Sequence, residues 1–551
     1  MTHRTSARAL TAFMEAGLAG ELNRRTLLQL AGTAAAATGL AMALPRGQRA
    51  SAAQAADNVF IYGSGQDISN LDPHTGSDYS IIWGQRAVYD GLMRFEGDPI
   101  ELKPLVLKEA TGSEDASTWT LVIDERATFQ DGSKITAEAV QWNFNRMLTK
   151  NKANAWMFAA VMNQDSITVV DEQTLEIALI KPFAPFDLIL PWLFVANPAI
   201  VAEHAGDDDG ESWLMENAAG SGPYTISRFE PGSLYQFDRF PGYWYTVEGA
   251  GDMVETFVWR IIRESSTKRI ALESGEIQYG DTFSTEDIAA LMADDRFMVN
   301  EKPSFSPFQL KLNTQVGPTA DVNVRKALTA LFDYDAALES LGGRGELLRG
   351  PLPTGLKPWF KEDLPGFKLD MDAAREHLAA SQYPNGFDIE FVYVTGLTFE
   401  ETFGLILLEK AAELGINVTL TPLVWPDMVA RAADAQTMPG IMAVLASSNY
   451  VDPDNYLWAQ YHSSQAGTWS AASWYQNPDL DALLEEGRST VDPDARKAIY
   501  DEAQQILVDD AVDIWIYAEM PNEAWVKELG PRAYQVAGGG DIRQISYNHP
   551  A

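Results

Sequence analysis

The clearest pattern of apolar and polar positions lies near the C-terminus of the chain. In the stretch NPDLDALLEEG, Leu480, Leu483 and Leu484 recur at the spacing of one helical face. Asn477 is a residue type that caps the start of a helix, and Gly487 is one that can end it. The pattern therefore predicts a helix between Asn477 and Gly487.

A second helix and a strand are predicted directly after the first helix. Asp492 and Pro493 begin a segment in which an apolar stripe faces acidic and amide residues. The stripe consists of Ile499, Ala503, Ile506 and Leu507. In residues 512–517, aliphatic positions then alternate with Asp, Trp and Tyr, as they do in a strand. A helix pair that returns the chain to a sheet is typical of a large α/β lobe.

The N-terminal residues 1–56 predict an export signal. Arg24 and Arg25 precede an alanine- and glycine-rich apolar run, and small residues near its end suit cleavage. This arrangement resembles a Tat signal, so we expect the Tat translocase to be an export partner and the periplasm to be the destination. A short buried helix or a membrane anchor is the alternative, but the run is too weakly apolar for a span of about 20 residues.

Composition agrees with this destination. The chain has no cysteine, so neither a disulfide framework nor a lipid-modified cysteine is available. Its formal net charge of −36 argues against nucleic acid and anionic membranes as partners. About 500 residues follow the leader, which is too many for one hydrophobic core. Since no linker divides them, we expect more than one lobe, with a chain that crosses between the lobes repeatedly.

No sequence motif for catalysis is found. The chain lacks a G-x-S-x-G elbow, a phosphate-binding loop, a dinucleotide fingerprint and an H-E-x-x-H motif. Its six histidines do not have the spacing of metal ligands. We therefore expect no enzymatic activity, no metal and no cofactor. A secreted hydrolase is a remote alternative, because carboxylate pairs abound in a chain with 77 acidic residues.

The stretches VYDGLMRF, SGPYTISRF, RFPGYW and SNYVDPDNYL occur in this order along the chain. Together they resemble, in sequence and in order, landmarks of one family, the peptide-binding periplasmic solute-binding proteins of ABC importers (family 5, the oligopeptide, dipeptide and nickel type). The resemblance implies a two-lobed α/β fold with an inserted subdomain and a ligand cleft between the lobes. A monomer of this kind would close around a solute and deliver it to a membrane permease with its ATPases.

The resemblance also implies how the chain is divided. Lobe I would combine residues 57–95, 200–305 and 512–551. The inserted subdomain would be residues 96–199, and lobe II would be residues 306–511. A solute that touches both lobes would favour the closed state of such a protein.

Two hallmark positions of the peptide-binding members differ in this chain. In those members an aspartate four residues before the proline of the D-P element anchors the ammonium of the peptide, and a tryptophan lies three residues further upstream. Counted from Pro453, these positions hold Asn449 and Ala446. An uncharged amide suits hydroxyl, amide or carbonyl groups instead of an ammonium.

The residues around Asn449 are further candidates for ligand contact. Its polar neighbours are Ser447, Ser448 and Tyr450. Alternatively, the loop is shifted by a few residues and another acid, such as Asp452 or Asp454, anchors an ammonium. The sequence leaves both interpretations open.

Aromatic side chains form the second group of candidates, because they stack on sugar rings or wall apolar groups. The resemblance places several of them near the cleft, namely Tyr79, Trp83, Phe305, Phe308, Trp425 and Trp469. The leading prediction is therefore a binding protein for a peptide-like or other small polar solute. The alternative is the same scaffold holding an oligosaccharide or a sugar conjugate.

Overall fold

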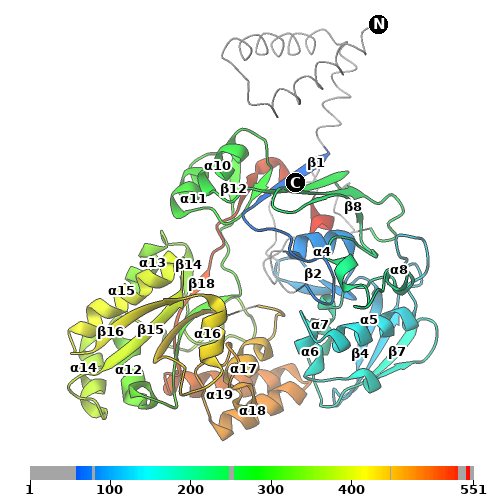
Figure 1. Ribbon diagram of the computed structural model, residues 1–551. Helices are drawn as coiled ribbons and strands as arrows, with labels where there is room; N and C mark the ends of the chain where they lie inside the picture. Colours follow the sequence, from blue (N-terminus) through cyan, green and yellow to red (C-terminus); the bar gives the residue numbers. More distant parts are fainter. Residues whose placement is uncertain (1–57, 77–80, 247–252, 447, 531–540, 546–551) are drawn as a thin grey trace, which may run out of the picture. The chain divides into compact units, whose positions relative to one another are not determined.

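A computed structural model shows the fold of the protein (Figure 1). It describes residues 58–76, 81–246, 253–446, 448–530 and 541–545. The predicted export signal, residues 1–56, lies outside these ranges. The compact folded unit spans Phe60–Ala551. No helix in the described ranges is both long and apolar enough to cross a bilayer.

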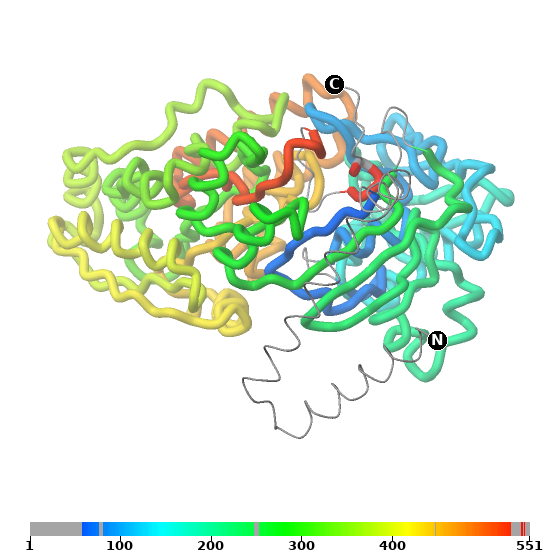
Figure 2. Tube along the Cα trace, turned by 90° about the horizontal axis from the view of Figure 1, so that it is seen from above, coloured from blue at the N-terminus to red at the C-terminus, as the bar shows by residue number. Residues whose placement is uncertain are grey.

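A seven-stranded mixed sheet gathers strands from both ends and the middle of the chain. Its order is β12-β19-β11-β1-β10-β9-β8. The strands are β1 (Val59–Ser64), β8 (Tyr224–Glu230), β9 (Leu234–Arg239), β10 (Thr256–Ile261), β11 (Tyr279–Gly280), β12 (Phe297–Val299) and β19 (Ala524–Val526). Strand β1, blue in Figure 2, lies beside the green strands of this sheet and pairs in parallel with β11. The packed helices are α4 (Ile82–Val88), α8 (Pro198–Glu203), α9 (Glu211–Leu214), α10 (Ser265–Glu273) and α11 (Thr285–Met292).

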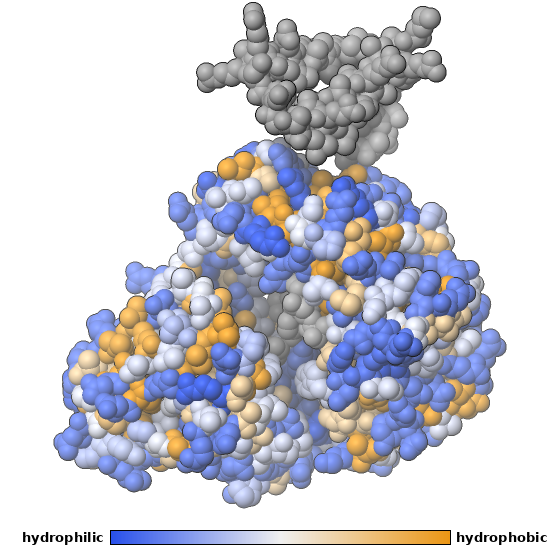
Figure 3. All heavy atoms as spheres, viewed as in Figure 1, coloured by the Kyte–Doolittle hydropathy of each residue, from blue (hydrophilic) through white to orange (hydrophobic). Residues whose placement is uncertain are grey.

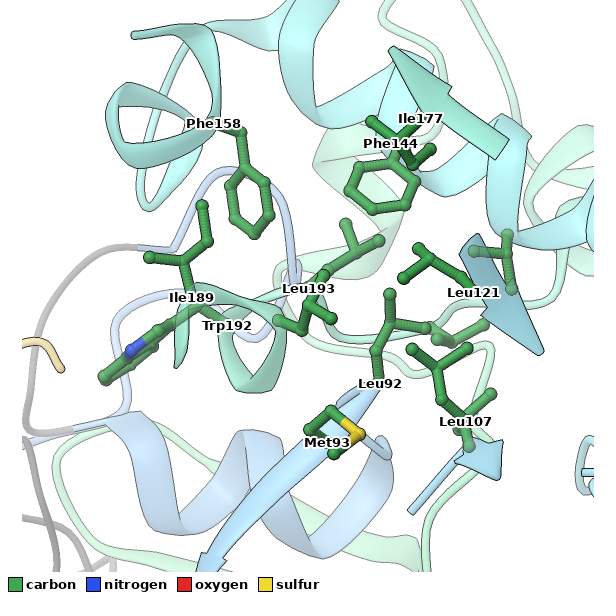
Figure 4. Close-up of a cluster of buried hydrophobic side chains, with 14 of the residues drawn as sticks. Leu92, Met93, Leu107, Leu121, Phe144, Phe158, Ile177, Ile189, Trp192 and Leu193 are labelled. Carbon is green, nitrogen blue, oxygen red and sulfur yellow. The ribbon is translucent and has the colours of Figure 1, made fainter. Parts of the chain in front are cut away.

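A four-stranded antiparallel sheet with the order β4-β5-β7-β6 is inserted between strands of the first sheet. Its strands are β4 (Leu107–Gly112), β5 (Thr118–Ile123), β6 (Ile167–Val169) and β7 (Thr174–Ala178), and the hairpin β2 (Met93–Glu96) and β3 (Glu101–Pro104) precedes it. Its helices are α5 (Ala137–Lys150), α6 (Ala155–Ala159) and α7 (Phe186–Ile189). In α5, Val140, Phe144 and Met147 form one buried face at helical spacing. In Figure 4, Phe144 lies beside Ile177 of β7 and Phe158 lies beside Ile189 of α7, and all four belong to one common core.

A six-stranded sheet is built from residues between 307 and 519. Its order is β14-β18-β13-β17-β15-β16. The strands are β13 (Pro307–Leu312), β14 (Gly345–Leu347), β15 (Asp388–Val394), β16 (Asn417–Leu423), β17 (Ile441–Leu445) and β18 (Asp513–Glu519). Parallel pairing of β15 with β16 and β17 confirms the predicted α/β class.

Helices cover both faces of the six-stranded sheet. One face carries α12 (Val322–Leu331), α13 (Tyr334–Ser340), α14 (Met371–Ala380) and α15 (Thr398–Ala412). The other carries α16 (Trp425–Ala432), α17 (Pro453–Tyr461), α18 (Pro478–Ser489) and α19 (Pro493–Asp509). Neighbouring strand residues alternate between the faces: Phe391 packs with the first group of helices and Val392 with the second.

The two C-terminal helices begin where the sequence predicts. Asn477 caps α18 by accepting the N–H of Leu480, and Asp492 caps α19 by accepting the N–H of Ala495 (2.8 Å). The predicted end at Gly487 is wrong, because α18 continues to Ser489. Gly487 is instead a packing position between the two helices.

The last strand corrects the predicted boundary of lobe II. Strand β18 begins one residue later than expected and lies between β14 and β13, so residues 513–519 belong to the six-stranded sheet. The chain returns to the seven-stranded sheet only at β19, which pairs with β11. The range 512–551 therefore does not belong as a whole to the first lobe. All residues of β18 from Asp513 to Ala518 are buried, as in a central strand covered on both faces.

Candidate ligand-binding site

A cavity of about 390 Å³ is bordered by residues from two distant stretches of the chain. The first stretch contributes Gly76, Ile82, Ala153, Asn154, Trp156 and Trp192. The second stretch contributes Ala446, Asn449, Asn455, Ala459, Gln460, Gln465, Thr468, Trp469 and Ser470. The volume lies within the range of pockets that hold small organic ligands.

The second stretch begins in the loop that joins the six-stranded sheet to α17. Strand β17 ends at Leu445, and α17 starts at Pro453, a residue suited to the first helical position. Asp452 caps this helix, because its side chain accepts the N–H of Asp454 (2.9 Å). Asn449 therefore lies in a short loop whose far end is fixed by a helix start.

Hydrogen bonds hold Asn449 from two directions. Its Nδ2 donates to Asn455 Oδ1 (3.1 Å), which also accepts the backbone N–H of Asn449 (3.3 Å). Its backbone carbonyl accepts a hydrogen bond from Trp192 Nε1 (2.6 Å). Trp192 belongs to the core of the inserted subdomain, and Figure 4 shows its indole nitrogen turned away from that core. The two stretches are thus joined by a hydrogen bond at the border of the cavity.

The two acidic side chains of this loop are buried in ion pairs. Asp452 contacts both terminal nitrogens of Arg496, at 2.5 and 2.8 Å. Asp454 Oδ1 lies 3.0 Å from Arg488 Nε, and its Oδ2 accepts a hydrogen bond from Tyr450 (2.7 Å). Burial raises the pKa of Asp454, and the charge of Arg488 opposes this shift. Neither acid lines the cavity, so the alternative in which one of them anchors an ammonium is not favoured.

Gln460 contributes another part of the lining and has a buried charge pair behind it. Lys311 Nζ lies 2.8 Å from Gln460 Oε1 and 2.9 Å from Asp513 Oδ2. The hydroxyl of Tyr461 also donates to Asp513 (2.8 Å). Burial lowers the pKa of Lys311, and the carboxylate of Asp513 opposes this shift. The neutral amide of Gln460 is therefore the lining group in contact with this pair.

Indole rings border the cavity from both stretches. Trp469 packs edge-to-face against Trp425, with ring centroids 5.3 Å apart. Trp425 is 39% exposed and supports Trp469 without lining the cavity itself, whereas Trp156 lines it and is 47% exposed. Further apolar side chains, among them Leu405 and Val424, are exposed over the part of the surface that holds α15 and α16 (Figure 3).

Of the predicted loop residues, some line the cavity and others are buried beside it. Asn449 and Trp469 line the cavity. Ser448 is buried and accepts a hydrogen bond from Tyr456 (2.8 Å), and Tyr450 packs into the core of the inserted subdomain. Neither Ser448 nor Tyr450 is among the residues that line this cavity. Their side chains hold the loop in place.

Three of the predicted aromatic residues lie in cores and not at the cavity. Trp83 is buried in the core of the seven-stranded sheet, with its ring 5.3 Å from that of Tyr62. Phe308 is buried in the core of the six-stranded sheet, and Phe305 packs at the margins of two cores. In each case burial of a large apolar surface decides the position. The predicted positions outside the described residues are Tyr79 and Ser447.

Several lining residues were not predicted from the sequence. Asn455 and Ala459 carry a usable signal, because positions four residues apart fall on one helical face, whereas Gln460 carries none. Trp156 and Trp192 carry no such signal. Their place depends on how the inserted subdomain folds and where it meets the loop after β17.

The lining offers neutral hydrogen-bonding groups and apolar surfaces. Among the residues that the structure describes, none with a charged side chain borders the cavity. The polar lining residues are Asn154, Asn449, Asn455, Gln460, Gln465, Thr468 and Ser470. The described ranges also contain no group of acidic and histidine side chains that could hold a metal ion. Such a site can bind an uncharged polar molecule through amides, hydroxyls and indole faces.

Comparisons with known proteins define the class of this protein. The sequence profile of the bacterial extracellular solute-binding proteins, family 5, matches residues 101–468. The chain belongs to this family of ABC-transporter binding proteins, which are not enzymes. The predicted two-lobed binding-protein fold is confirmed by solved structures. One of them is the periplasmic binding protein DppA from Helicobacter pylori in complex with the peptide STSA, which has a TM-score of 0.74 and 20% identity and covers 88% of this chain and 97% of its own.

Curated relatives match over most of their length. The chain is 27% identical over 482 residues to the "Probable D,D-dipeptide-binding periplasmic protein DdpA" of Escherichia coli K12, covering 86% of this chain and 90% of the relative. It is 24% identical over 489 residues to the glutathione-binding protein GsiB of Pectobacterium atrosepticum, covering 86% and 91%. The protein is therefore an extracytoplasmic binding component of an ABC transporter.

Proposed function

We propose that this protein captures an uncharged, hydrogen-bonding solute of about dipeptide or disaccharide size and delivers it to the permease and ATPases of an ABC importer. The uncharged lining of the cavity is the observation that carries this proposal. A buried ammonium without a paired carboxylate would be strongly disfavoured in such a site. Neutral amide and hydroxyl groups of a solute would find hydrogen-bonding partners among the amide and hydroxyl side chains of the lining.

The position of Asn449 supports the same proposal. Counted from Pro453, it would occupy the place where the peptide-binding members carry their anchoring aspartate, and it lines the cavity. The neighbouring acids Asp452 and Asp454 pair with arginines of α19 and α18. A peptide-like solute with a blocked or distant amine would fit this loop, in keeping with the peptide names of the relatives.

A carbohydrate or sugar conjugate is the second candidate solute. Three lining residues are tryptophans, and Trp156 and Trp469 approach the cavity from different stretches of the chain. Indole faces stack on sugar rings, while amides and hydroxyls bond sugar hydroxyls. This combination favours a ring-containing neutral solute.

The remaining parts of the proposal concern export and assembly. The twin arginines Arg24 and Arg25 support export by the Tat translocase. We propose a monomer whose lobes close on the solute. Lobe I would hold the seven-stranded sheet, the inserted subdomain the four-stranded sheet, and lobe II the six-stranded sheet with β18.

A thermal-shift experiment tests the proposed solute class. The probes are the dipeptide Ala-Leu, N-acetyl-Ala-Leu amide and cellobiose. A solute bound only by the native state raises stability by about 2.7 kcal/mol at 100 times its dissociation constant. We expect the melting temperature to rise with at least one neutral probe and to respond less to Ala-Leu. A rise with Ala-Leu alone would contradict the uncharged-ligand proposal.

A further inference from the structure

A buried polar network lies directly behind the wall of the cavity. Gln309, Lys311, Gln460 and Asp513 are each at most 2% exposed. Lys311 Nζ bridges Gln460 Oε1 (2.8 Å) and Asp513 Oδ2 (2.9 Å), and it lies 4.6 Å from the ring centre of Tyr461. Such a network rigidifies its members when all of them find partners.

The network determines which way the amide of Gln460 points. A lysine ammonium has only donors, so the Gln460 atom that it contacts must be the oxygen. Gln309 Nε2 donates to the same oxygen. Rotating the amide by half a turn would set Gln460 Nε2 against two donors and leave a buried ammonium without its acceptor.

We infer that the Lys311–Asp513 pair acts through Gln460 to present N–H donors to the cavity, so that the ligand must place an uncharged oxygen acceptor there. With Oε1 directed at Lys311, the other branch of the planar amide, Nε2, is the one that remains available to the cavity that Gln460 lines. None of the described residues accepts a hydrogen bond from this nitrogen. A protonated amine at this point would meet N–H groups and would be excluded.

This inference rests on the proposed function, and it assigns roles to two kinds of residue. Gln460 is the specificity-determining group, because it touches the ligand. Lys311 and Asp513 are positioning residues, because they act only by orienting that amide. The ligand class is thereby narrowed to neutral molecules with a carbonyl, hydroxyl or ether oxygen.

Three disaccharides that differ only at carbon 2 of each sugar make a matched probe set. Cellobiose carries hydroxyls, di-N-acetylchitobiose carries acetamides, and chitobiose carries amines that are protonated at about pH 6. Calorimetry at that pH gives the ratio of the chitobiose dissociation constant to that of the better neutral probe. For the wild-type protein we expect a ratio of about ten or more, since the amine lacks an acceptor for Gln460.

Gln460→Glu is the decisive variant. The glutamate keeps one oxygen on Lys311 and turns the other toward the cavity, so a donor becomes a charged acceptor at nearly constant volume. We expect the ratio to fall about tenfold or more, because the neutral probes lose a donor and chitobiose gains a charge-assisted contact. Gln382→Glu adds the same charge at an exposed position between α14 and β15 and should leave the ratio unchanged.

A second variant tests the positioning residues and guards against a folding failure of the first. In Lys311→Met with Asp513→Asn, the pair is removed together, so neither charge is left buried alone. The Gln460 amide is then no longer held in one orientation. We expect the ratio to fall about threefold or more while the circular dichroism spectrum stays that of the wild type.

The outcomes separate the inference from the proposed function. Wild-type protein that prefers a neutral probe, together with variants whose ratio is unchanged, would overturn the role of Gln460 and leave the proposed function standing. Wild-type protein that binds chitobiose most tightly, or binds none of the three probes, would overturn the proposed ring-containing neutral solute and the inference with it.

Discussion

Glu400 gives a prediction whose size and sign can be worked out from the structure. It lies in the first turn of α15, is 2% exposed, and its Oε2 accepts the backbone N–H of Val394 (2.7 Å). Burial raises the pKa of Glu400 to about 7 from an ordinary 4.5, and the hydrogen bond from Val394 opposes the shift. The native state therefore binds this proton more tightly than the unfolded chain does.

The sign follows from linkage. Between about pH 4.5 and pH 7 the native protein holds more protons than the unfolded chain, so the free energy of unfolding falls as the pH rises. Below about pH 4.5 the Glu400 carboxyl is protonated and does not lower the free energy of unfolding. Above about pH 7 it is ionised in the native state, and the full loss of stability is present. At about 1.4 kcal/mol per unit of pKa, the loss is about 2–4 kcal/mol.

The perturbation is Glu400→Gln, which keeps the oxygen that accepts from Val394 and removes the charge. We expect the variant to match the wild type near pH 4.5 and to melt about 2–4 °C higher at pH 8, taking about 1 °C per kcal/mol for a chain of this length. Glu401→Gln, at an exposed position of the same helical turn, is the control and should leave the profile unchanged. Differential scanning calorimetry across this pH range is the assay.

Two results would refute this reasoning. A wild-type melting temperature with the same pH dependence as that of Glu400→Gln would mean that the carboxyl titrates normally. A variant that is less stable at every pH would mean that Glu400 acts mainly through a contact that the amide cannot replace.

Three further predictions concern the ligand, the helix pair and export. Asn449→Asp should strengthen calorimetric binding of Ala-Leu by about tenfold or more, because a charge-assisted contact is worth about 1.5–3 kcal/mol, and unchanged binding would show that position 449 does not meet the ligand. Gly487→Ala should lower the melting temperature, because the added methyl would lie 2.8 Å from the ring of Tyr500, at a cost of about 1–3 kcal/mol. An unchanged melting temperature would contradict the close packing of the two helices. Arg24→Lys with Arg25→Lys should leave precursor in the cytoplasm on immunoblots, and undiminished periplasmic protein would contradict the Tat assignment.

Local features of the fold could be predicted from the sequence because their causes are local. The starts of α18 and α19 follow from Asn477 and Asp492, whose side chains bond N–H groups two or three residues ahead. The same reasoning gave a wrong end for α18 at Gly487. Glycine can end a helix, but here the absence of a side chain allows Tyr500 of the next helix to approach, and that contact depends on tertiary packing.

The sequence predicted residues of the candidate site mainly in segments that could be aligned with landmarks of the family. Counting from Pro453 brought Asn449 to the cavity, and an aromatic loop position, Trp469, also lies there. Trp83 looked equally suitable from its sequence position but is buried among aromatic rings. Composition does not distinguish a tryptophan in a core from one in a binding site, because both environments remove apolar surface from water.

In the loop after β17, the residues that form ion pairs are not the residue that we expect to contact the ligand. Asp452 and Asp454 fasten the loop to α19 and α18 by buried ion pairs, to which Asn449 adds a neutral side-chain hydrogen bond with Asn455. A binding protein built in this way can exchange aspartate for asparagine at that position without refolding the loop. Its ligand preference can therefore diverge through single substitutions, while the scaffold that closes on the solute is inherited unchanged.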